Sequence, residues 1–109
     1  MLFRSSALYS NTTGTPNDAF GYQALYSNTT GVNNVAVGLQ ALATNTIGTD
    51  NTAIGWQSLN ANITGTSNTA VGRTALYTNQ TGIDNTGLGR GALYLNTASF
   101  NTEIGRAHV

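Results

Sequence analysis

The sequence predicts an all-β fold of the parallel β-solenoid class (β-roll), with one repeat in each coil. Two observations predict it: a unit of 17 residues recurs six times, and glycine and asparagine return at fixed places within each unit. Seventeen residues are too few for a strand, a helix and their loops, and the frequent glycines and Asn-Thr pairs oppose helix propagation. Stacked coils of short strands joined by turns are therefore expected.

The repeats divide the chain into one domain, residues 1–109. The first unit, ALYSNTTGTPNDAFGYQ, aligns without gaps on ALYSNTTGVNNVAVGLQ, and the sixth unit is one residue shorter than the others. Partial coils at 1–6 and 108–109 flank the full coils, which indicates a window on a longer fibre. The full coils span 7–23, 24–40, 41–57, 58–74, 75–91 and 92–107.

Two columns of the aligned repeats stay large and apolar, and we expect both to face the interior. Position two is always leucine: Leu8, Leu25, Leu42, Leu59, Leu76 and Leu93. Position fourteen is always apolar: Phe20, Val37, Ile54, Val71, Leu88 and Ile104. Position thirteen is mostly alanine, and in an assembly of parallel chains the column of Ala19, Ala36, Ala53 and Ala70 is expected near the shared axis.

Asparagine fills positions five and eleven of every coil. Stacked amides at a strand spacing of about 4.8 Å can pass hydrogen bonds from coil to coil, so these columns predict structural ladders. The ladder at position eleven comprises Asn17, Asn34, Asn51, Asn68, Asn85 and Asn101. Between the strand-like runs A-L-Y-x-N-T and N-T-A-V-G, glycine and asparagine are expected to turn with positive φ. Each coil is therefore predicted to hold two short strands.

Composition excludes several classes of function. The charged side chains balance, four of each sign, so no basic footprint for nucleic acid is present. The chain lacks cysteine, and no apolar run approaches the roughly 20 residues that span a bilayer, so neither a thiolate metal site nor membrane insertion is expected. The single histidine, His108, stands near the chain end, which leaves a catalytic triad or a histidine metal cluster without support. We expect no metal, no cofactor and no enzymatic activity.

Two sets of residues are candidates for functional sites. Position sixteen is the variable column, which indicates exposure: its arginines could bind sulfate, phosphate or sugar carboxylates, and its aromatic residues could stack on a glycan ring. The candidate ligand-binding residues are Tyr22, Trp56, Arg73, Arg90 and Arg106. A plain solvated surface is the competing interpretation. Asp50 and Asp84 share position ten, two coils apart, near the upper separation of an inverting glycosidase pair, but turn aspartates are common for local hydrogen bonding alone.

The core N-T-A-V-G followed by A-L, with N-T-T-G before the next asparagine, resembles the repeat arrays of phage tail-fibre proteins and related bacterial surface proteins. It is also similar, more loosely, to the N-S-V-A-I-G repeats of trimeric autotransporter adhesin heads. The resemblance covers residues 7–107 and implies a parallel homotrimer of left-handed β-rolls. It also implies an extracellular location, on a virion tail fibre or a bacterial cell surface.

We therefore expect a structural or adhesive fibre segment, a shaft or head that mediates attachment to a host or surface. A cell-surface glycan or receptor would be met through other parts of the fibre. The alternative is a glycan-binding or ice-binding β-solenoid, in which threonine columns at positions six, seven and twelve would form the working face. Interruptions such as Ile47, Ile63 and Gln80 make those columns less regular than an ice-matching array requires.

Overall fold

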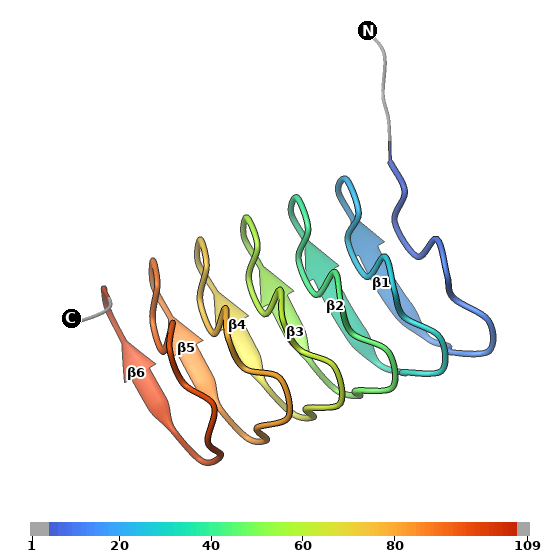
Figure 1. Ribbon diagram of the computed structural model, residues 1–109. Coiled ribbons are helices and arrows are strands. Elements are labelled where there is room, and N and C mark those ends of the chain that lie inside the picture. The colour runs from blue at the N-terminus through green and yellow to red at the C-terminus, as the bar shows by residue number, and fades with distance from the viewer. Residues whose placement is uncertain (1–4, 107–109) are drawn as a thin grey trace, which may run out of the picture.

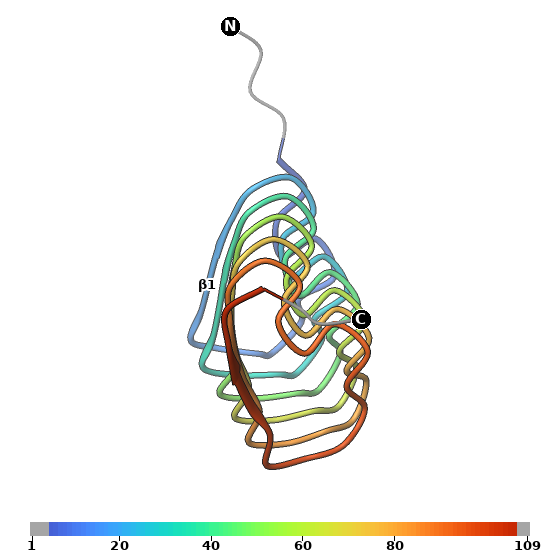
Figure 2. The same ribbon diagram turned by 90° about the vertical axis from the view of Figure 1, so that its left-hand side faces the viewer.

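The computed structural model describes residues 5–106, which form a parallel β-solenoid without a helix in that range (Figure 1). Its six strands make one parallel sheet whose spatial order follows the chain. Viewed roughly along the stack, the coils lie one behind another with similar outlines (Figure 2). The predicted all-β solenoid with tandem repeats is confirmed. The strands are β1 (Asn17–Phe20), β2 (Asn34–Val37), β3 (Thr52–Ile54), β4 (Thr69–Val71), β5 (Thr86–Leu88) and β6 (Thr102–Ile104).

Strand pairing joins equivalent positions of successive repeats. Ala36 of β2 pairs with Ala53 of β3, a step of 17 residues. Thr86 of β5 pairs with Thr102 of β6, a step of 16 residues that absorbs the deletion in the last coil. A slip by one residue would turn every side chain to the opposite face of the sheet. Because no slip occurs, each column of the aligned sequence is a column of side chains in space.

Each coil contains one strand, where the sequence predicted two. The Ala-Leu-Tyr run forms turns, because the leucine at position two has positive φ in every described coil, 50° at Leu25 and 48° at Leu59 for example. Extended strands require negative φ, so this leucine ends the run. Neighbouring coils still bond there, since Leu25 N donates to Ala41 O at 3.0 Å. The Ala-Leu-Tyr run therefore turns the chain back toward the next strand and still forms backbone hydrogen bonds with the neighbouring coil.

The interior is filled by the leucine column and by small residues. The leucines of coils two to five are fully buried, and so are alanines at positions one and thirteen, such as Ala41 and Ala53. The two walls meet across this interior: a Cβ placed on Gly87, at position thirteen, would lie 3.5 Å from Leu76 Cγ. A branched leucine therefore projects into space that the alanine of the strand leaves open.

The prediction that position fourteen faces the interior is wrong. Val37, Ile54 and Val71 are 38%, 40% and 36% exposed, and Phe20 and Ile104 are 68% and 76% exposed. Side chains alternate across a strand, so the asparagine at position eleven and the alanine at thirteen point inward while twelve and fourteen point outward. The interior is too narrow for a large side chain from both walls, and the leucine column already occupies it.

We expect Leu59→Ala to lower the free energy of unfolding by about 2 to 5 kcal/mol, because it removes a fully buried side chain from the middle of the stack. Urea unfolding at a fixed protein concentration measures it. Leu39→Ala is the matched control, since that leucine is 41% exposed at position sixteen and its loss should cost less than about 1 kcal/mol. A loss below about 0.5 kcal/mol for Leu59→Ala would contradict the assignment of the core.

Candidate functional site

Position sixteen lies on a turn between the strand and the first residue of the next repeat. Backbone hydrogen bonds hold it on both sides: Gly72 N donates to Ile54 O at 2.8 Å, and Thr74 N donates to Trp56 O at 2.9 Å. Gly72 has φ of 133°, a conformation that glycine adopts easily and other residues rarely adopt. A Cβ at this position would also lie 2.5 Å from Gly89 O, too close for any side chain. Successive residues at position sixteen are therefore fixed in line at the strand spacing of about 4.8 Å.

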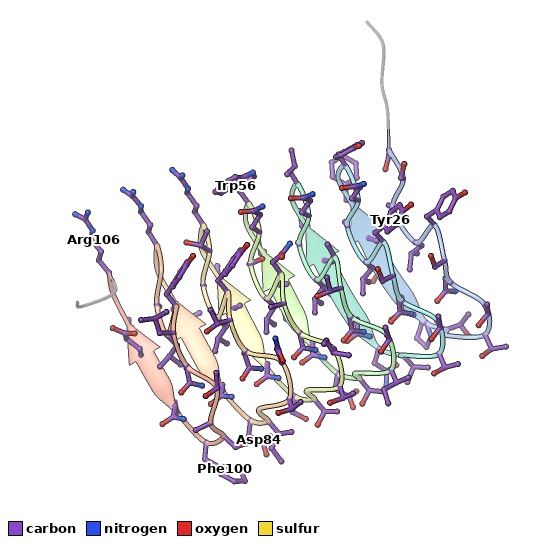
Figure 3. All side chains as sticks on the ribbon, viewed as in Figure 1. Tyr26, Trp56, Asp84, Phe100 and Arg106 are labelled. Carbon is purple, nitrogen blue, oxygen red and sulfur yellow. The ribbon has the colours of Figure 1, made fainter. Side chains whose placement is uncertain are left out.

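The structure brings all five predicted ligand-binding residues onto one edge of the solenoid. All five are exposed, with values of 45% for Tyr22 and 41% for Trp56. Trp56 and Arg106 both project from the upper edge in Figure 3, whereas Asp84 and Phe100 project from the lower edge. Uncharged side chains occupy the edge in the first three coils. Arginines occupy it in the last three: Arg73, Arg90 and Arg106, hereafter the arginine row.

One contact along this edge changes the role expected for the tryptophan. The guanidinium carbon of Arg73 lies 4.6 Å from the centroid of the Trp56 ring, a cation–π contact. One face of the indole is therefore covered by Arg73 rather than open to a sugar. The contact joins the guanidinium to an aromatic ring and not to a hydrogen-bond acceptor, so the N–H groups of Arg73 stay available for an oxyanion.

A second exposed surface is the outer face of the sheet, and sequence reasoning missed the exposure of its apolar column at position fourteen. The outer face of the sheet carries position fourteen beside the mostly threonine column at position twelve: Val35, Thr52, Thr69, Thr86 and Thr102 follow Asp18 there. From coil two onward this face carries no charged side chain in either column. The alternation of N-T-A-V, with an invariant asparagine turned inward, was the signal that could have revealed it.

The aspartates at position ten belong to turns. Asp50 has φ of 58° and Asp84 has φ of 54°. The Asp50 carboxylate accepts hydrogen bonds from Asn33 Nδ2 at 3.0 Å and from Thr49 Oγ1 at 3.1 Å. Residues 5–106 contain no cluster of three His, Cys, Asp or Glu side chains that could hold a metal ion, and His108 lies outside the described residues. Local hydrogen bonding accounts for Asp50 without a catalytic role.

The threonine columns do not form one free hydroxyl array. At position six the hydroxyls donate to backbone carbonyls of the next coil: Thr29 Oγ1 to Thr46 O at 3.1 Å and Thr46 Oγ1 to Ile63 O at 3.2 Å. A hydroxyl used in this way helps to join the coils. An ice-binding face built on position six therefore gains no support from the structure.

Comparison with protein-family models, with curated proteins and with solved structures finds no significant match to this chain. No segment within residues 5–106 forms a helix that is long and apolar enough to cross a membrane. The class that the geometry defines is a parallel β-solenoid with tandem repeats.

Proposed function

We propose that this chain is a segment of an extracellular fibre, a shaft or head of a phage tail fibre or a bacterial surface adhesin, assembled as a parallel homotrimer. The observation that carries the proposal is the uncovered apolar column on the outer face of the sheet, where Phe20 is 68% and Ile54 is 40% exposed. A contiguous apolar stripe on a solvent-exposed surface indicates an interface. The stripe runs the full height of the stack, as an axial contact in a fibre would.

A second copy of the chain is the partner that fits this face. In parallel chains at the same height, each coil meets the identical coil, so apolar side chains meet apolar side chains along the whole stack. The face of coils two to six has no charge in positions twelve and fourteen, so no like charges would be brought together. The stoichiometry of three chains rests on the resemblance to the repeats of tail fibres and trimeric adhesins.

The side chains that face the shared axis differ from those first expected. Ala36, Ala53 and Ala70 are fully buried within their own chain, so the alanine column cannot contact other chains. In the proposed trimer, Val37, Ile54 and Val71 take that place. The axis then lies outside the sheet, and the interior of each coil remains closed.

The rod function is supported by how the stack is built. Strands contact only their sequence neighbours in the sheet, so each added repeat extends the stack by one coil without rearranging the others. The length and stiffness of the rod, together with the exposed edge at position sixteen, would then serve attachment to a host or surface.

Sedimentation equilibrium tests the assembly: we expect a species of three times the 11.3 kDa chain mass at micromolar concentration. Ile54→Lys should weaken or abolish the trimer, because three lysines would be forced together at one height. Ile47→Lys is the matched control, since Ile47 is 53% exposed in the same coil but lies off the sheet face. A wild-type chain that is folded yet monomeric would refute the trimer and leave the solenoid intact.

A further inference from the structure

We propose that the arginine row binds a linear acidic polysaccharide that lies along the solenoid axis, with the carboxylate or sulfate groups of the polymer on Arg73, Arg90 and Arg106. The inference goes beyond the fibre function. It does not depend on the trimer, because the row stands on the edge of the coils at position sixteen and the proposed axis lies on the sheet face.

The row is a line of positive charges with no acidic partner among residues 5–106. All three arginines are exposed, and no ion pair to them is found within residues 5–106. Glu103, the acid nearest in sequence to Arg106, accepts a hydrogen bond from Leu93 N at 2.6 Å. Like charges on successive coils, about 4.8 Å apart along the backbone, repel one another, and an oxyanion chain laid across them would replace repulsion with attraction.

The backbone and one side chain pre-organise the row. Gly91 N donates to Arg73 O at 2.9 Å and Gly105 N donates to Leu88 O at 2.7 Å, so the coils that carry the arginines are held in register. The Trp56 ring, 4.6 Å from the Arg73 guanidinium carbon, supports that group by its face. The N–H donors of that guanidinium remain open for a bidentate contact with a carboxylate or sulfate. Trp56 is therefore a positioning residue.

An acidic polysaccharide fits this row better than other polyanions. Nucleic-acid binding calls for a net basic domain, usually with aromatic faces free for base stacking, whereas this chain has a formal net charge of +0 and a tryptophan covered on one face. Anionic membranes are recognised by clusters of about four to eight basic residues. The three arginines form a single row, which suits one flexible polymer chain that carries acidic groups at regular intervals.

Calorimetric titration of the full chain with polygalacturonate, dextran sulfate and plain dextran is the test. We expect both acidic polymers to bind and plain dextran not to bind. Trp56 is the single tryptophan of the chain, so its fluorescence should change with the same saturation curve as the heat. The variant R73Q/R90Q/R106Q should lose at least about ten-fold in affinity with an unchanged circular dichroism spectrum, since position sixteen already accepts tyrosine, leucine and tryptophan.

A second variant separates a site from general charge. It combines the three arginine replacements with Thr30→Arg, Thr64→Arg and Thr97→Arg, which restore the net charge at exposed positions in alternate coils. The proposal requires this variant to stay as weak as the triple glutamine variant. Binding equal to wild type in the relocated variant would overturn it, as would the failure of wild type to bind either acidic polymer. Tighter binding of an oligodeoxythymidylate would overturn it in favour of nucleic acid.

Discussion

Replacing Asn51 by leucine should lower the free energy of unfolding by about 3 to 7 kcal/mol. Asn51 is fully buried in the middle of the ladder at position eleven. Its Nδ2 donates to Gly65 O at 2.8 Å, and its Oδ1 accepts from the backbone N of Asn68 at 3.0 Å. Leucine has neither group, so Asn68 N would lose its acceptor in an interior that water does not reach.

The size of this effect follows from the connection between the two ladders. Gly65 O accepts from Asn51 Nδ2 at 2.8 Å and also from Asn62 Nδ2 of position five at 3.0 Å. The same arrangement recurs in other coils, and every buried side-chain N or O atom in residues 5–106 has a hydrogen-bond partner. An orphaned buried amide costs about 1 to 3 kcal/mol, and each further bond that is lost adds about 0.5 to 1.5 kcal/mol.

Asn60→Leu is the control for this substitution. Asn60 stands at position three, where tyrosine and alanine occur in other coils, and its Nδ2 makes one hydrogen bond, to Gln40 O at 3.0 Å. Its replacement should cost less than about 1.5 kcal/mol. Both variants are compared by urea unfolding at one protein concentration, because oligomerisation shifts apparent stability. Equal losses would show that the Asn51 ladder contributes no more than a single peripheral hydrogen bond.

The repeat made the fold class predictable. The same polar residue recurs at the same position of every repeat, and stacking the repeats in register lets these residues bond to one another. The leucine at position two was assigned to the interior, where it is found. The asparagine at position eleven was predicted to form a ladder; it does so, and its burial is an addition from the structure. The assignment failed at position fourteen because a large apolar side chain is not necessarily a buried one. In a coil this narrow, one large column fills the interior and the strand opposite must be small there, so Ala53 is inside and Ile54 is outside.

The turns were the other failure, and their physical reason is similar. Leucine disfavours positive φ, so nothing in the composition of Ala-Leu-Tyr indicates that Leu42 has φ of 51°. The conformation is held by burial of the side chain and by hydrogen bonds to the next coil, which local sequence does not reveal. At the candidate site, the exposure of position sixteen followed from its variability, but the contact of Arg73 with Trp56 depends on side-chain conformation.

Glycine at position eight was expected to turn with positive φ, yet none of these glycines does so in the described coils. Their role is the close approach of successive coils. A Cβ on Gly65 would lie 2.5 Å from Gly82 O and in steric conflict with Asn62 Oδ1. In coil six, Ala98 takes this position, and no further coil is stacked on it in the described residues.

We therefore expect Gly65→Ala to lower the free energy of unfolding by about 3 to 6 kcal/mol, since the methyl group must push apart two coils and disturb the amides of both ladders. Gly87→Ala is the matched control: its Cβ would lie 3.0 Å from Ala92 O, and alanine already occupies position thirteen in coils one to four. That change should stay within about 1 kcal/mol of wild type. Urea unfolding of both variants decides the matter, and a Gly65→Ala chain as stable as Gly87→Ala would mean that the coils can separate locally without loss of the ladders.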